Sequence, residues 1–251
     1  MNQNFNLYSQ YYDLLYQDKD YGAEADYLHQ LINRYRPKST SILELGSGTG
    51  KHANLLAEKN YNILGLERSA EMVEIANRTK TKNVDFKIAD ITEFQTNQSF
   101  DVAVSLFHVI SYLTDNQSLI NTFKNVHRHL NENGLFIFDV WHSSAVNFQV
   151  PEKRTKTLQN EVIQVTRHAN PIIDTEQNIV EVNYTIKVKD LEDGTTFHIE
   201  ESHPMRHFSK PEIELLAYAT GFEVIHKEEF LTKAIPSAET WGVCYILKKL
   251  S

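Results

Sequence analysis

The chain has one cysteine, no long apolar run and fewer basic than acidic residues. Cys244 is the only cysteine among the 251 residues, so an intrachain disulfide cannot form and a reducing compartment is expected. No stretch approaches the about 20 apolar residues of a membrane-spanning helix. Residues 1–5 have neither the basic start nor the apolar run of a signal peptide. We therefore expect a cytoplasmic protein with no membrane partner.

The charge balance argues against a nucleic-acid-binding protein. With 25 Lys and Arg against 33 Asp and Glu, the net charge is −8, whereas a nucleic-acid footprint needs a basic surface. We therefore expect no nucleic-acid partner. We also expect no metal, because five histidines between residues 108 and 207 lack the compact spacing of metal ligands. These are His108, His142, His168, His198 and His203. The length fits one large domain or one domain with a lobe, as a monomer or homodimer.

The segment 41–50 joins a short apolar strand to a glycine-rich turn and then to a helix. Its glycines are spaced G-x-G-x-G at Gly46, Gly48 and Gly50, which differs from the G-x-G-x-x-G of dinucleotide-binding proteins. Without Cβ atoms the loop lets a ligand approach the backbone. Glu67 ends the next apolar strand, where a carboxylate can accept bonds from both hydroxyls of a ribose. The loop and the acid together indicate a nucleoside site.

Strands and helices then alternate. The pattern predicts helices over 21–35, 51–59, 70–78 and 116–130, and strands over 42–45, 63–66, 84–88, 102–106 and 135–140. Alternating units of this kind form a parallel sheet covered by helices on both faces. After a different segment, a capped helix over 209–221 and strands over 222–225 and 241–247 complete the pattern. We expect a doubly wound α/β fold.

Two segments do not follow this alternation. Residues 180–188 alternate apolar and polar side chains with period two, and Asp193-Gly194 marks a hairpin turn into 196–200, with 162–165 alongside. Residues 5–16 are rich in tyrosine, which fits either of two interpretations: a lid over the site, or an aromatic stripe docked on the core. The expected domains are an N-terminal helical lid over 1–36, the α/β core over 37–142 and 205–251, and an antiparallel β-lobe over 143–204.

The chain resembles the class I S-adenosylmethionine-dependent methyltransferases. The matching residues are Glu44 to Gly50, Gly65 to Met72, Ala89-Asp90-Ile91 and Phe100 to Val104. The resemblance implies a Rossmann-like seven-stranded sheet with the donor at the glycine loop. The cofactor contacts that it implies are Gly46, Ser47, Gly48, Gly50, Glu67, Arg68, Met72, Asp90, Ile91, Leu106 and Phe107. Asp90 would accept from the adenine amino group, although it could instead cap the following turn.

The residues 11–15 and 200–208 resemble the corresponding stretches of nucleotide-linked aminosugar N-methyltransferases. That resemblance implies a methyl transfer to the amine of a small nucleotide-linked sugar, with the β-lobe and the lid covering the acceptor. It suggests His108, Tyr12 and Tyr112 for catalysis, and Trp141, His203 and Arg206 for acceptor binding. His108 could also be a purely structural strand-end residue.

One departure leaves the acceptor open. The strand ends in Asp139-Val140-Trp141-His142, whereas those relatives have an acid-proline pair followed by two aromatic residues. The alternatives are a small-molecule O-methyltransferase, a non-catalytic S-adenosylmethionine-binding protein and an NAD-dependent oxidoreductase. The last is disfavoured by the glycine spacing and by the lack of a Tyr-x-x-x-Lys pair.

Overall fold

The computed structural model describes residues 14–15 and 19–251, which divide into two compact units. The larger unit comprises residues 21–149 and 206–251, and the smaller unit comprises residues 150–205 with the described part of 1–20. Residues 1–13 and 16–18 of the expected lid, including Tyr12, lie outside the described residues. Residues 21–35 belong to the larger unit.

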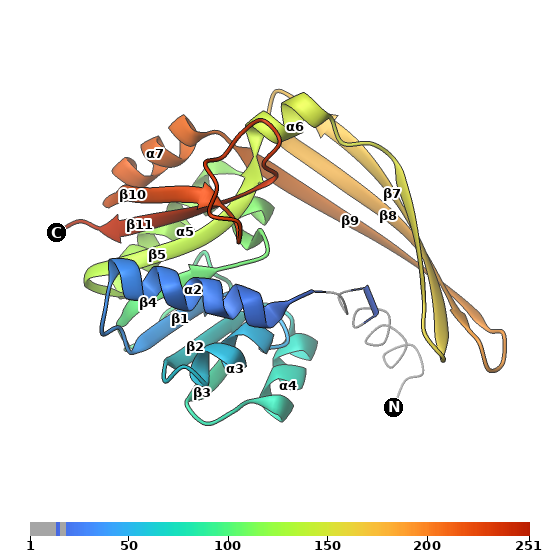
Figure 1. Cartoon of the computed structure of the whole chain (residues 1–251), viewed down its shortest axis with the longest axis horizontal. Helices are drawn as coiled ribbons and strands as arrows, with labels where there is room; N and C mark the ends of the chain where they lie inside the picture. Colours follow the sequence, from blue (N-terminus) through green and yellow to red (C-terminus); the bar gives the residue numbers. More distant parts are fainter. Residues whose placement is uncertain (1–13, 16–18) are drawn as a thin grey trace. The chain divides into compact units, whose positions relative to one another are not determined.

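The larger unit carries the α/β alternation (Figure 1). Its helices are α2 (Tyr21–Tyr35), α3 (Lys51–Ala57), α4 (Ala70–Thr79), α5 (Asn116–His129), α6 (Ser143–Gln149) and α7 (Lys210–Ala219), with a 3-10 turn η1 (Val109–Tyr112). Its strands are β1 (Ser41–Leu45), β2 (Asn62–Glu67), β3 (Val84–Ile88), β4 (Phe100–Ser105), β5 (Leu130–His142), β10 (Phe222–Glu229) and β11 (Gly242–Lys249).

The strands form one sheet in the order β3-β2-β1-β4-β5-β11-β10. The first five run parallel, and β11 is antiparallel to both β5 and β10. This is the expected seven-stranded, doubly wound arrangement. The carboxyl ends of β1, β2, β4 and β5 therefore lie at one edge of the sheet, where ligands of open α/β sheets bind.

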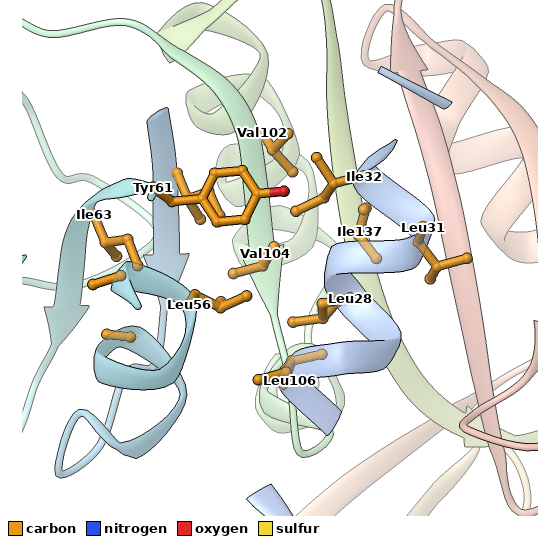
Figure 2. Close-up of a cluster of buried hydrophobic side chains, with 14 of the residues drawn as sticks. Leu28, Leu31, Ile32, Leu56, Tyr61, Ile63, Val102, Val104, Leu106 and Ile137 are labelled. Atoms are coloured by element: carbon orange, nitrogen blue, oxygen red, sulfur yellow. The ribbon is translucent and has the colours of Figure 1, made fainter. Parts of the chain in front are cut away.

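Alternation of side chains along the strands builds a core on each face of the sheet. Ile42 of β1 joins one apolar cluster with residues of α2, α3 and α4, whereas Leu43 and Leu45 join a second cluster with α5 and α7. Figure 2 shows the first cluster, with Leu28 and Ile32 of α2 facing the sheet. Both side chains are fully buried, which typically stabilises a fold by roughly 1.5–3 kcal/mol each.

The smaller unit is an antiparallel sheet of β6 (Arg154–Gln159), β7 (Ile163–Asp174), β8 (Ile179–Asp190) and most of β9 (Thr196–Phe208). One face carries a small apolar cluster, which contains Leu14, Ile163, Val165, Ile186 and Val188. The predicted strands are present but longer, and β6 and α6 were not predicted. The residues of β6 are almost all exposed, so that strand has no apolar periodicity to reveal it.

Candidate active site

The glycine loop leads from β1 into α3 and adopts left-handed backbone conformations that glycine favours. Gly46, Gly48 and Gly50 have φ angles of 70°, 54° and 78°. A Cβ on Gly46 would lie 2.6 Å from a methyl carbon of Val109, so the loop backbone packs directly against η1. A Cβ on Gly48 would meet no atom within 4 Å. The backbone of Gly48 therefore borders open space.

Glu67 joins this loop to the end of β2. Its Oε2 accepts a hydrogen bond from the Gly48 amide at 3.1 Å, and its Oε1 accepts one from the Ser69 amide at 2.9 Å. The Leu66 carbonyl accepts bonds from the amides of Gly46 and Ser47, at 2.8 and 3.0 Å. The carboxylate is thus fixed in place and each oxygen keeps a lone pair, which fits the predicted contact with a ribose diol.

The other predicted donor-side residues are arranged around the ends of β2, β3 and β4. The Met72 amide donates to Ser69 Oγ at 3.2 Å and so takes part in the N-cap of α4. Asp90 Oδ1 accepts from the Thr92 amide and hydroxyl at 2.8 and 2.7 Å, and these bonds lower the pKa of Asp90. Asp90 therefore caps the following turn, and its contact with adenine stays a prediction. Arg68 is exposed and Ile91 is half-buried.

The end of β4 has an unusual backbone. Leu106 is buried, and the next two residues, Phe107 and His108, have φ angles of 64° and 60°. Left-handed conformations of non-glycine residues cost about 1–3 kcal/mol each and gather at functional sites. The two aromatic rings stack with centroids 6.2 Å apart. The strained turn displays both rings at the carboxyl edge of the sheet.

Asp139, at the end of β5, contacts His108 twice. Its Oδ1 accepts from the His108 amide at 3.1 Å, and its Oδ2 lies 2.7 Å from His108 Nδ1, with the ring turned off the ideal hydrogen-bond angle. The Asp139 side chain is 1% exposed and the His108 side chain 25% exposed. The sequence pattern did not identify Asp139 as a site residue, although a carboxylate in an apolar buried strand was a usable signal.

Two of the predicted acceptor-side residues, Trp141 and Tyr112, belong to the larger unit. The ring of Trp141 lies edge-on to His108 at 6.3 Å and to Trp241, which was not predicted, at 5.8 Å. Tyr112 ends η1 and is 40% exposed. Trp141 therefore places an aromatic ring beside His108.

Arg206 and His203 lie in different units. Arg206 bonds to Glu212 at 3.1 Å and to Asn116 at 2.8 Å, so its guanidinium is engaged by the larger unit itself. His203, in the smaller unit, lies 3.2 Å from Glu201. Their roles with the acceptor stay predictions.

A second carboxylate that was not predicted lies under the glycine loop. Glu44 of β1 is 2% exposed, and burial, together with the charge of Glu67, raises the pKa of Glu44 to about 8. His52 lies between two acids, with its Nδ1 3.9 Å from Glu44 and its Nε2 2.6 Å from Glu24. One oxygen of Glu44 accepts no hydrogen bond from the described residues.

No three His, Cys, Asp or Glu side chains within 14–15 and 19–251 gather as metal ligands would. In the same part of the chain, no helix is long and apolar enough to cross a membrane.

The sheet order, the glycine loop and the fixed acid define a nucleoside-binding α/β fold, and comparison with known proteins narrows this class. The methyltransferase domain family matches residues 42–134. A relative from Streptomyces fradiae, named dTDP-3-amino-3,6-dideoxy-alpha-D-glucopyranose N,N-dimethyltransferase, is 30% identical over 217 residues, covering 85% of this chain and 82% of that protein. The chain therefore belongs to the methyltransferase family, as the resemblance predicted.

Solved structures support the fold. A methyltransferase from Clostridium acetobutylicum, described as S-adenosylmethionine-dependent, superposes with a TM-score of 0.84 over 99% of this chain and all of that one, at 22% identity. DesVI from Streptomyces venezuelae superposes with a TM-score of 0.81 over the full length of both chains, at 21% identity. The predicted seven-stranded methyltransferase fold with an antiparallel insertion is confirmed.

Proposed function

We propose that this methyltransferase transfers a methyl group from S-adenosylmethionine to the amine of a nucleotide-linked aminosugar. The observation that carries the donor is the glycine loop, whose open backbone at Gly48 is fixed to the carboxylate of Glu67. The acceptor rests on the relative with an aminosugar name, which matches most of this chain. When bound, the donor supplies a methyl group activated by a sulfonium.

The loop residues and Glu67 hold the methionine and ribose parts of the donor. The other donor contacts in the proposal are Arg68, Met72, Asp90, Ile91, Leu106 and Phe107. Methyl transfer is an in-line displacement, so the enzyme contributes mainly by holding the nucleophile about 3–3.5 Å from the methyl carbon in a dry site.

On the acceptor side, we assign His108, Tyr112 and Trp141 to the reacting amine, because their rings lie at the carboxyl ends of β4 and β5. Tyr12, His203 and Arg206 are assigned to the sugar nucleotide on the resemblance alone. The cytoplasm is the proposed compartment, since the only cysteine is a buried thiol.

A titration with matched glycine variants tests the donor site. Gly48 and Gly194 both have positive φ angles, of 54° and 76°, and a Cβ on either would meet no atom within 4 Å. Gly48→Val and Gly194→Val therefore impose similar backbone strain, but only the first places a side chain at the loop. We expect Gly48→Val to weaken binding of S-adenosylmethionine on the order of 100-fold, about 3 kcal/mol, with Gly194→Val close to the wild type.

Calorimetry with S-adenosylmethionine, S-adenosylhomocysteine and NAD measures this effect, and mass spectrometry then follows methylation of dTDP-3-amino-3,6-dideoxyglucose. Equal donor affinity in the two variants, or binding of NAD alone, would remove the donor assignment. Donor binding without methylation of the aminosugar would instead favour an O-methyltransferase, and no turnover with any acceptor would favour a binding protein.

A further inference from the structure

We infer that Asp139 is a positioning residue which keeps the Nε2 atom of His108 unprotonated, so that His108 can take a proton from the acceptor amine. The proton transfer from the acceptor rests on the proposed function, whereas the tautomer of His108 does not. It starts from a single buried carboxylate that contacts both the backbone and the ring of His108.

The contact selects one tautomer of the histidine. An ionised carboxylate only accepts hydrogen bonds, so the ring nitrogen that faces it, Nδ1, must carry the hydrogen. Nε2 then keeps its lone pair. This is the relation between acid and base in the Ser-His-Asp triad, where the acid orients the imidazole and stabilises its charged form without itself taking the proton.

Groups from several elements border the His108 ring. Phe107 stacks on one side, Trp141 lies edge-on, and the ring carbon Cε1 would be 3.3 Å from a Cβ added to Gly242 of β11. The carbonyl of His108 also accepts from the Ser111 amide at 2.9 Å. The backbone of His108 is therefore bonded to β5 and η1, and its ring lies beside Trp141 of β5 and Gly242 of β11.

The titratable group beside Asp139 on the neighbouring strand is Cys244 of β11, which lies opposite it in the sheet register. Burial raises the pKa of the Cys244 thiol, so it stays neutral and does not compete for the negative charge. Tyr112 is the nearest titratable side chain along the chain on η1. The charge opposite a protonated His108 is that of Asp139.

The proton and electron balance follows. An aminosugar is mainly an ammonium ion at neutral pH and has no lone pair to attack with. One proton passes from the ammonium to Nε2 of His108, and the imidazolium is stabilised by Asp139. The freed lone pair forms the carbon–nitrogen bond while the electrons of the broken sulfur–carbon bond remain on sulfur. The imidazolium afterwards releases its proton to water.

The first test reads the tautomer directly in the full chain labelled with 15N-histidine. The signal of His108 is assigned as the one missing in His108→Gln. We expect hydrogen on Nδ1 in the wild type. In Asp139→Asn we expect hydrogen on Nε2, because the amide oxygen still accepts from the His108 backbone while its NH2 group now faces Nδ1. Hydrogen on Nε2 in the wild type would overturn the inference, whatever the acceptor is.

The second test is turnover of dTDP-3-amino-3,6-dideoxyglucose against pH. Asp139→Asn should lower kcat about 100-fold or more, as loss of a general base does, and make the rate rise with pH because the amine must lose its proton in water. Donor affinity, measured by titration, should stay within about twofold. The double variant Asp139→Asn/His108→Gln should be no slower than His108→Gln alone, because the two residues act as one unit.

Asp101→Asn is the matched control. Asp101 is another hydrogen-bonded carboxylate of the larger unit, at the opposite end of β4, bonded to Arg36 and Asn131. Its loss should destabilise the fold but leave the tautomer of His108 and the pH profile unchanged. Additive losses in the double variant, or an unchanged pH profile in Asp139→Asn, would contradict the inference. If the wild type does not methylate the sugar, the acceptor assignment fails while the tautomer measurement still decides the role of Asp139.

Discussion

Replacing Glu44 with glutamine should stabilise the protein at neutral pH. Burial, with the charge of Glu67, raises the pKa of Glu44 to about 8 from its ordinary value of 4.5. Between these two values the folded chain binds a proton that the unfolded chain has released. The free energy of unfolding therefore falls as pH rises, by about 1.4 kcal/mol per pH unit for this one group.

The magnitude follows from that window. At pH 7 the difference between the folded and unfolded states of Glu44 costs about 3 kcal/mol, and below pH 4.5 it costs nothing. Glutamine is neutral at every pH and close in shape, so Glu44→Gln should recover about 2–3 kcal/mol at pH 7. In a chain of this length that raises Tm by about 4–12 °C.

Thermal unfolding of Glu44→Gln and wild type at pH 4.5, 6 and 8 measures the effect. The gain should be small at pH 4.5 and largest at pH 8. Glu223→Gln, at an exposed position of β10, is the control and should change stability by less than about 0.5 kcal/mol. The reasoning is refuted if Glu44→Gln destabilises the protein by the same amount at all three pH values, since the carboxylate would then be a stabilising partner.

Two further predictions concern Asp101, near the start of β4, and Gly46, which follows β1. Burial alone would raise the pKa of Asp101, but hydrogen bonds from Thr40 and Arg36 outweigh it and hold the pKa well below its usual range. Asp101→Asn should therefore lower the free energy of unfolding, measured in urea at pH 7, by about 2–3 kcal/mol. The difference from wild type should shrink as the pH falls toward the pKa of Asp101 in the folded protein. A difference that stays constant down to pH 2 would contradict this. Gly46→Ala should lower the free energy of unfolding by about 2 kcal/mol or more and weaken donor binding, because its Cβ would lie 2.6 Å from Val109 at a left-handed φ. Adding Val109→Ala in the same chain should restore part of the stability and part of the donor affinity. If calorimetry shows no recovery, the contact with Val109 is not the cause.

The regular part of the fold could be predicted because burial leaves a pattern of apolar residues in the sequence. Strands such as β1 and β4 are apolar on both faces, and helices such as α2 carry a single apolar stripe. Strand β6 lacks such a pattern, because it is held by pairing with β7 rather than by burial. Its existence depends on a neighbour that local sequence does not reveal.

In the site, too, local motifs could be predicted from the sequence, whereas contacts between distant residues could not. The glycine loop and Glu67 form a local motif, and Glu67 does bond to Gly48. The pairing of His108 with Asp139 joins residues 31 positions apart and needs the order of β4 and β5 in the sheet. For Arg206, the sequence did not reveal the bonds of its guanidinium to Glu212 and Asn116, and its role with the acceptor stays a prediction.

The bonds between the glycine loop and the end of β2 have a consequence for how the donor is recognised. Gly46, Ser47 and Gly48 all donate to Leu66 or Glu67, so the protein itself holds the loop in place. The conformational entropy of this loop is thus lost during folding and not at the moment of binding. A donor that enters the site consequently meets a preorganised surface, and none of its binding free energy is needed to order the loop.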